Sequence, residues 1–424
     1  MTHVVSADAR SWVPVAHDSP FPIQNLPYGV FSTEDAGARI GVAIGDHILD
    51  LDAVARAGLL EGLALPATVF STHSLNPFIA LGRPIWTEVR AWVAELLSAD
   101  NDELQEAGIA TRSLVARQKA TMHRPVEVPD YVDFYSSIHH ATNVGKLFRP
   151  GGDPLLPNWL HLPVGYHGRS GTIVVSGTDV TRPSGQRRGQ DGGPPVFGPS
   201  VALDFELEVG FITDDANELG QPIPVAEAEE HIFGLCLVND WSARDLQAWE
   251  YQPLGPFLGK SFATSVSPWV VPLDAVDPYR VEPPPQDPAV LPYLQTKGPT
   301  GLDLRLEVEI VPEGGAAGTT VTSTGFADMY WTMAQQLAHA TVNGATARAG
   351  DLFASGTVSG PGAGTLGSLL EITKNGAEPI TLDDGSERTY LRNGDTVILR
   401  GRCESPRGPI IGFGDCVGTV LPAN

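Results

Sequence analysis

Three acidic residues stand two positions apart in segment 203–211 and form the strongest chemical signal in the chain. Asp204, Glu206 and Glu208 alternate there with apolar residues, and successive side chains of a β-strand point to opposite faces. We therefore expect a strand with one apolar face and one face of three carboxylates. Carboxylates side by side repel one another, and a shared divalent cation removes that cost. The alternative is a solvated acidic face, which antiparallel sheets commonly carry.

A second group of polar residues follows an apolar run at 232–238. Asp240 comes just after this run, as it would if a buried strand carried a carboxylate into a site. Ser242 and Asp245 have the S-x-x-D spacing of a capping box, so we expect a short helix from Ser242 to about residue 251. Three residues of that helix would share one polar face: Arg244, Gln247 and Tyr251. A surface helix would also be polar on one side, so this pattern leaves both interpretations open.

Lys260 lies in segment 255–261, among glycines and apolar residues. A lysine in such surroundings either extends its amine to solvent or pairs it with acids. The acids of the first two groups are candidates for that pairing.

Two adjacent histidines follow a short run that suits a strand. Asp133 and Tyr135 would share a face of that strand, and we expect His140 in the polar turn after it. An imidazole titrates near neutrality, so His140 is a candidate general base. His139 is its neighbour, and spacing alone does not decide between the two.

Composition limits what the protein can be. The chain has 424 residues, of which 42% are hydrophobic and 18% charged, which indicates a folded, enzyme-sized protein of two or three domains. It has neither a basic, apolar leader nor an apolar run long enough to span a membrane, so we expect a cytoplasmic protein. Three cysteines without C-x-x-C spacing argue against a disulfide framework and a structural zinc site. A net charge of −23 disfavours nucleic acid and membranes as partners.

The elements that must position these residues are mostly strands. A hairpin is expected at 38–51 around Gly45-Asp46, and a helix at 84–98. The sequence turns polar and proline-bearing around 117–129, so we predict two domains, 1–124 and 125–424. The second contains short β-rich runs separated by Gly and Pro, which favour a sandwich, roll or barrel. We expect few helices there, the clearest at 328–342.

Long stretches of the chain closely resemble the fumarylacetoacetase family. They include the histidine segment and the segments that contain Asp240 and Lys260, and they lie in both the front and the back parts of the chain: 21–31, 133–137, 140–145, 157–169, 239–245, 253–262 and 354–361. The resemblance implies a mainly β fold with few helices, made of a small SH3-like front barrel and a larger mixed β-roll catalytic domain. It also implies a homodimer.

The resemblance implies a role for each residue of a site. The implied ligands of a Ca²⁺ or Mg²⁺ ion are Asp133, Glu206, Glu208 and Asp240, with Lys260 and Thr264 near a second or alternative metal position. Asp204 is not among them and returns to the solvated-face interpretation. The implied catalytic groups are His140 as general base, Glu371 as its orienting partner, and Arg244, Gln247 and Lys260 as the oxyanion-stabilising set. The implied substrate contacts are Tyr135, Arg149, Tyr166, Gln247, Tyr251 and Thr357.

The implied reaction is hydrolysis of a carbon–carbon bond in 4-fumarylacetoacetate, a small dianionic diketo acid. It would give fumarate and acetoacetate in the last step of tyrosine and phenylalanine catabolism. His140 with Glu371 would take a proton from water, and the metal would stabilise the departing enolate. Two alternatives stay open. A metal-dependent decarboxylase or hydratase would not need the oxyanion set, and a Ca²⁺-dependent binding module would not need the histidine.

Overall fold

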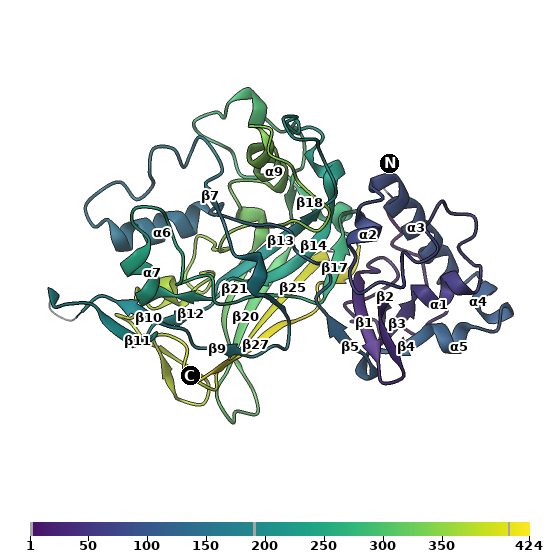
Figure 1. Cartoon of the computed structure of the whole chain (residues 1–424), viewed down its shortest axis with the longest axis horizontal. Coiled ribbons are helices and arrows are strands. Elements are labelled where there is room, and N and C mark those ends of the chain that lie inside the picture. Colours follow the sequence, from purple (N-terminus) through teal and green to yellow (C-terminus); the bar gives the residue numbers. More distant parts are fainter. Residues whose placement is uncertain (1–2, 190–191, 406–407) are drawn as a thin grey trace.

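The computed structural model describes residues 3–189, 192–405 and 408–424. Figure 1 shows the first part of the chain, in purple, as a smaller unit beside a larger one. The expectation of a mainly β chain is confirmed, because most strands of the described residues lie in one sheet of thirteen strands and one of six.

The thirteen-stranded sheet runs through both units in the order β4-β3-β2-β1-β17-β14-β13-β22-β6-β7, with β5, β8 and β16 paired off this path. Its strands are β1 (Tyr28–Thr33), β2 (Ala36–Ile44), β3 (His47–Asp50), β4 (Leu114–Ala116), β5 (Thr121–His123), β6 (Tyr131–Phe134), β7 (Gly165–His167), β8 (Ile173–Val175), β13 (Leu207–Thr213), β14 (Ile232–Asn239), β16 (Thr264–Val266), β17 (Trp269–Pro272) and β22 (Leu352–Ala354).

The second sheet has the order β21-β20-β25-β27-β9, with β26 paired to β25. Its strands are β9 (Val180–Thr181), β20 (Arg305–Val311), β21 (Thr319–Gly325), β25 (Thr396–Ser405), β26 (Gly408–Gly412) and β27 (Cys416–Leu421). Four two-stranded ladders join β10 (Ser184–Arg187) to β11 (Val196–Pro199), β12 (Leu203–Asp204) to β15 (Ser242–Ala243), β18 (Arg280–Val281) to β19 (Gly301–Leu302), and β23 (Ile380–Thr381) to β24 (Glu387–Arg388).

The helices of the described residues are α1 (Leu51–Arg56), α2 (Asn76–Ile79), α3 (Arg83–Leu96), α4 (Glu103–Glu106), α5 (Ala110–Ser113), α6 (Ile138–Phe148), α7 (Arg244–Glu250), α8 (Leu273–Val276), α9 (Met333–Thr341) and α10 (Leu369–Ile372). Most of these helices are short, and the longest are α3 with 14 residues and α6 with 11.

The front unit contains the expected hairpin. Ile44 pairs with His47 across a two-residue turn, and Gly45 has a φ of 53°, a backbone conformation that glycine adopts without steric cost. The expected helix at 84–98 is α3, which has Pro84 in its first turn. Among the described residues, the strand pairings form an open ladder from β4 to β1, and not the closed barrel of the SH3-like expectation.

The central strands β13 and β14 bury both of their faces. Leu207, Val209 and Phe211 pack into the core of the larger unit. On the opposite face, Ile212 and Val238 belong to the core shared with the front unit. Side chains on either face of these two strands are therefore shielded from solvent.

The expected strand at 203–211 is interrupted at Phe205 and Glu206, so a single continuous strand was wrong. β12 pairs with β15 and β13 pairs with β14, and the ladder breaks where the chain opposite turns at Asp240. The backbone N–H of Asp240 donates to the Glu206 carbonyl at 3.3 Å. The break therefore places Glu206 beside Asp240.

Two helix boundaries differ from expectation. The expected capping box at Ser242 is wrong, because Ser242 lies in β15 and α7 begins at Arg244 with no side-chain cap. The helix expected at 328–342 begins only at Met333, where Thr332 forms a capping box with Gln335. In both cases a tertiary contact or a better cap outweighs the local pattern.

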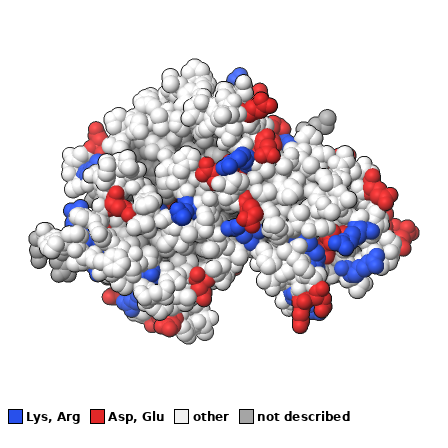
Figure 2. All heavy atoms as spheres, viewed as in Figure 1, with Lys and Arg blue, Asp and Glu red and all other residues white. Residues whose placement is uncertain are grey.

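On the face shown in Figure 2, acidic and basic side chains are interspersed. None of the described helices is long and apolar enough to cross a membrane.

Candidate active site

Four buried carboxylates meet at the centre of the larger unit. They come from the end of β6, the break before β13, β13 itself and the turn after β14: Asp133, Glu206, Glu208 and Asp240. One ligand oxygen from each lies within 4.8 Å of the others. The two acids of segment 203–211 in this cluster are 5% and 0% exposed, so the solvated-face interpretation is wrong for them.

Lys260 lies among these carboxylates. Its Nζ is 2.6 Å from Glu206 Oε2 and 2.6 Å from Asp240 Oδ2. Burial would lower the pKa of Lys260, but Asp240 and Glu206 outweigh it and hold the pKa above its usual range. The expected pairing with acids is found, and the amine serves as a counter-charge more readily than as a metal ligand. Thr264 Oγ1 donates to Asp240 Oδ1 at 2.7 Å.

Two carboxylate oxygens of the cluster, Asp133 Oδ1 and Glu208 Oε1, are buried without a hydrogen-bond partner among the described residues. Burial raises the pKa of both carboxyls well above the usual range, and neighbouring acids raise each further. Hard cations such as Ca²⁺ and Mg²⁺ bind carboxylate oxygens. The donor set and its two unpartnered oxygens therefore fit a divalent cation.

A histidine–carboxylate pair lies nearby. His140 lies in the first turn of α6, which Ser137 caps, and not in the turn expected after the strand. His140 Nδ1 is 2.6 Å from Glu371 Oε2, and three further groups hold that glutamate. Asn143 Nδ2 donates to Oε1 at 2.9 Å, and the hydroxyls of Ser359 and Ser368 donate to Oε2 at 2.8 and 3.0 Å. Burial would raise the pKa of Glu371, but His140, Asn143 and Ser359 outweigh it and lower the pKa. The glutamate is thus held as an anion against the imidazole.

The face of α7 that the sequence predicted as polar points partly into the site. Arg244 Nη1 is 2.6 Å from Glu206 Oε1 and donates to Gln247 Oε1 at 3.2 Å. Arg244 Nη2 is buried without a partner in the described part of the chain. Tyr251, at the end of the helix, is 41% exposed and makes no hydrogen bond to the cluster among the described residues.

The other expected substrate contacts differ in burial and in the groups that they contact. Tyr166 OH donates to Asp240 Oδ2 at 3.2 Å. The Tyr135 ring meets the His140 ring edge-on at a centroid distance of 5.2 Å. Arg149 folds back along α6 over Gly145 and bonds the Pro154 carbonyl. Thr357 is buried, and its Oγ1 has no partner among the described residues.

A cavity of about 470 Å³ opens onto the Lys260 side of the cluster. Its lining includes Tyr166, Asp240 and Thr264, together with Pro256 and Phe257 of the loop before Lys260. Small-molecule sites are usually concave cavities of this size. The carboxylate cluster is therefore accessible from one side.

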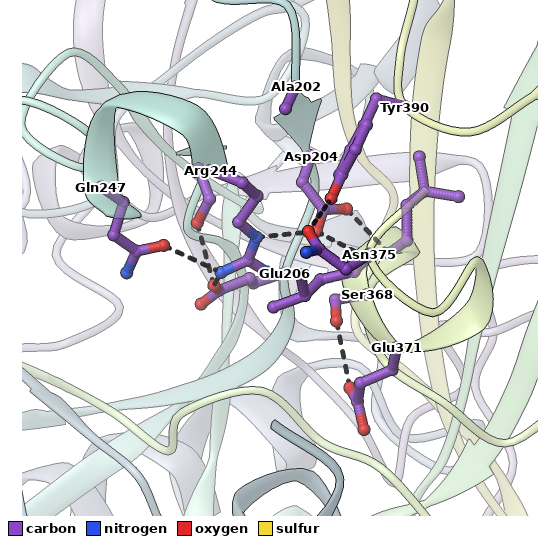
Figure 3. A network of polar contacts seen from close by, with 12 residues as sticks. Ala202, Asp204, Glu206, Arg244, Gln247, Ser368, Glu371, Asn375 and Tyr390 are labelled. Carbon is purple, nitrogen blue, oxygen red and sulfur yellow. Dashed lines mark hydrogen bonds and ion pairs between the residues drawn. The ribbon is translucent and has the colours of Figure 1, made fainter. Parts of the chain in front are cut away.

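Asp204 is the largest departure from the sequence interpretation. It is 0% exposed and lies outside the carboxylate cluster, where its Oδ2 accepts from Arg244 Nε at 2.8 Å (Figure 3). The expectation that Asp204 lies on a solvated face was therefore wrong.

Sequence reasoning also missed residues that support the site. Ser242 donates its hydroxyl to Glu206 Oε1 at 2.9 Å, although its spacing suggested a helix cap. Asn143 follows His140 by three positions, a helical spacing that could have indicated a shared face. Ser359 and Ser368 are more than 200 residues from His140 along the chain, and no local pattern connects them to it.

A buried carboxylate cluster beside a His–Glu pair supplies groups that a hydrolase can use, a candidate cation site and a candidate base for water. Residues 24–125 match the fumarylacetoacetase N-terminal domain, and residues 131–421 match the fumarylacetoacetate (FAA) hydrolase C-terminal domain. The chain belongs to the fumarylacetoacetase family.

Curated relatives match over nearly the full length. The fumarylacetoacetase of Caenorhabditis elegans is 55% identical over 98% of this chain and 100% of its own length. The fumarylacetoacetase of Homo sapiens is 51% identical over 97% of this chain and 99% of its own. Among solved structures, a fumarylacetoacetate hydrolase from Exiguobacterium antarcticum covers 94% of this chain and 100% of its own, with a TM-score of 0.53 and 19% identity, a likeness of fold.

Proposed function

We propose that this enzyme hydrolyses a carbon–carbon bond of 4-fumarylacetoacetate to give fumarate and acetoacetate. The full-length similarity to curated fumarylacetoacetases supports this substrate. The observation that carries the proposal is the 2.6 Å contact between His140 and Glu371 beside the buried carboxylate cluster. That arrangement joins a water-activating base to a site that can hold a cation.

Asp133, Glu206, Glu208 and Asp240 would hold Ca²⁺ or Mg²⁺, with Lys260 and Thr264 beside them. A bound cation of this kind supplies positive charge to the oxygens of a 1,3-diketone and to the enolate that forms from it. One oxygen of Asp133 and one of Glu208 have no hydrogen-bond partner among the described residues, which supports this assignment.

His140 would act as general base. When its Nδ1–H donates to Glu371, the lone pair lies on Nε2, and among the described residues no partner occupies that nitrogen. Nε2 can then take a proton from water as the water oxygen attacks the carbonyl carbon. Glu371 stabilises the imidazolium that forms and fixes its orientation.

Arg244, Gln247 and Lys260 would stabilise the alkoxide produced by this attack. The Nη2 of Arg244 is buried and has no partner in the part of the chain that the structure describes, which supports that role. The carbon–carbon bond then breaks, and its electron pair leaves with the acetoacetate fragment. The hydroxyl from water stays on the new carboxyl of fumarate, and the proton ends on acetoacetate.

Substrate binding is the role we propose for Tyr135, Arg149, Tyr166, Tyr251, Thr357 and also Gln247. The substrate carries two negative charges, and Arg149 and Arg244 supply local positive charge in a chain of net charge −23. A homodimer remains the expectation from the family resemblance, and a cytoplasmic location remains the expectation from the sequence.

Incubating the purified protein with fumarylacetoacetate, with and without a chelator, tests the proposal. We expect equal amounts of fumarate and acetoacetate, identified by chromatography, and loss of turnover in chelator that added Ca²⁺ or Mg²⁺ restores. Release of carbon dioxide would favour a decarboxylase, and absence of turnover with retained Ca²⁺ binding would favour a binding module.

His140→Ala, with His139→Ala as its matched control, tests the identity of the base in the same assay. Loss of a general base should lower kcat by about 10²- to 10⁴-fold, whereas His139 makes no hydrogen bond to the site among the described residues. A large loss in His139→Ala together with full activity in His140→Ala would reverse the assignment.

A further inference from the structure

Asp204 connects two elements that the proposed mechanism uses separately. Its Oδ2 accepts from Arg244 Nε at 2.8 Å and from the backbone N–H of Leu370 at 2.9 Å. Its Oδ1 accepts from the N–H of Leu369 at 2.7 Å. Figure 3 shows the carboxylate between Arg244 on one side and the α10 turn with Glu371 on the other.

On the α7 side, Asp204 fixes the plane of the Arg244 guanidinium. Nε is held by Asp204 and Nη1 by Glu206 and Gln247, at 2.8, 2.6 and 3.2 Å respectively. Two carboxylates on a planar fork determine its orientation. Nη2 is the nitrogen left without a partner in the described part of the chain, so its direction depends on both acids.

On the α10 side, Asp204 anchors the turn that carries Glu371. The first N–H groups of a helix have no partner within the helix, and Asp204 accepts from two of them, at Leu369 and Leu370. Glu371 is the next residue, and its Oε2 contacts His140 Nδ1 at 2.6 Å. Movement of this turn would move the carboxylate that orients the imidazole.

We infer that Asp204 is a positioning residue that sets the geometry between Arg244 and the Glu371–His140 pair. This inference rests on the proposed function. The water activated by His140 must reach a carbonyl carbon whose oxygen turns toward Arg244. The His140 imidazole and the Arg244 guanidinium must therefore keep a fixed distance and orientation relative to one another. The Asp204 carboxylate is fully buried and accepts three hydrogen bonds, one from α7 and two from α10, so it can keep this arrangement fixed.

Asp204→Asn tests the link because it keeps the side-chain size. An amide offers only one acceptor oxygen, so whichever way it is turned, its NH₂ faces a donor, Arg244 Nε or Leu369 N–H. We expect kcat to fall about tenfold to a hundredfold with KM changed less than about twofold, as misplacement of catalytic groups does. Cation affinity measured by calorimetry should stay near wild type, because Asp204 is not in the cluster.

Asp395→Asn is the matched control. Asp395 is also 0% exposed, accepts from Arg388 Nε and Nη2 at 2.8 Å each, and accepts from the backbone N–H of Arg392 at 2.8 Å. Both variants should lose comparable stability in thermal unfolding, and only Asp204→Asn should lose kcat. Equal effects on kcat, or wild-type kcat in Asp204→Asn, would overturn the inference.

A readout independent of turnover separates this inference from the proposed function. The His140 Nδ1–H proton, followed by NMR in the enzyme without substrate, should shift or exchange faster in Asp204→Asn and stay unchanged in Asp395→Asn. A shift together with no activity of the wild-type enzyme on fumarylacetoacetate would overturn the proposed substrate and leave the link supported. An unchanged resonance would overturn the link.

If Asp204→Asn does not fold, a variant of its partner Arg244 tests the same connection between Arg244 and His140. Arg244→Ala removes a partner of Asp204, and Lys260→Met removes a cation that does not contact Asp204. The His140 resonance should move more in Arg244→Ala than in Lys260→Met. An equal or smaller movement would contradict the link.

Discussion

At the scale of single residues, three acids of equal charge have three different environments. Asp204 is satisfied by Arg244 and two backbone N–H groups. Burial would raise the pKa of Glu206, but Lys260 and Arg244 outweigh it and hold the pKa below its usual range. Burial and the neighbouring Asp133 and Asp240 raise the pKa of Glu208 well above its usual range. Replacing Glu206 and replacing Glu208 by glutamine should therefore change the stability of the protein in different ways.

We predict that Glu206→Gln destabilises the protein by about 3 kcal/mol, because the buried Lys260 and Arg244 each lose one of their two carboxylate partners. Glu208→Gln should not lower the stability in chelator, because it removes a repelling charge. Binding of Ca²⁺ or Mg²⁺ should raise the melting temperature of the wild type by mass action, and this rise should be absent in Glu208→Gln. Thermal unfolding with chelator and with excess cation measures all three effects.

The exposed Glu61 provides a control, since Glu61→Gln should behave as the wild type in both conditions. A cation-induced rise in melting temperature that persists in Glu208→Gln would rule out the ligand assignment.

At the scale of elements, the turn after β22 shapes the cluster through its backbone. Gly356 has a φ of 76°, and its N–H donates to Glu208 Oε2 at 3.1 Å. A Cβ at this position would run into the carbonyl oxygen of Phe134. The residue must be glycine for steric as well as conformational reasons.

Gly356→Ala should destabilise the protein by about 1–3 kcal/mol and weaken cation binding, because Glu208 moves with the turn. Urea unfolding and calorimetry measure the two effects. Gly362→Ala is the matched control, because it lies in the following exposed loop, where a Cβ would make only an ordinary contact with Thr365. If both variants unfolded at the same urea concentration, the close approach of Gly356 to the Phe134 carbonyl oxygen would not contribute to stability.

The elements also show what the sequence could predict. Alternation in segment 203–211 correctly separates the buried apolar face from the acids, because the period of two survives the break at Phe205 and Glu206. The break itself depends on the neighbouring strand, which turns at Asp240, and the local alternation of residues cannot predict it. Ser242 carries a cap-like spacing and instead donates to Glu206, 36 positions away in the chain.

At the scale of the whole molecule, distant segments build the site. His140 and Glu371 are separated by 231 positions, so only the family resemblance, and no spacing, could pair them. Strand β1 of the front unit pairs with β17 of the larger unit through Tyr28 and Gly29, which joins both units in one sheet. The domain boundary near residue 124 and the homodimer remain predictions.

The source of the oxygen in fumarate tests the central claim, that activated water cleaves the carbon–carbon bond. The reaction is run in water labelled with heavy oxygen, and the products are analysed by mass spectrometry with fumarate in the same buffer as an exchange control. We predict one heavy oxygen in a carboxylate of fumarate per turnover, at a rate that falls in His140→Ala. Fumarate formed without label, or carbon dioxide released in its place, would contradict hydrolysis at this site.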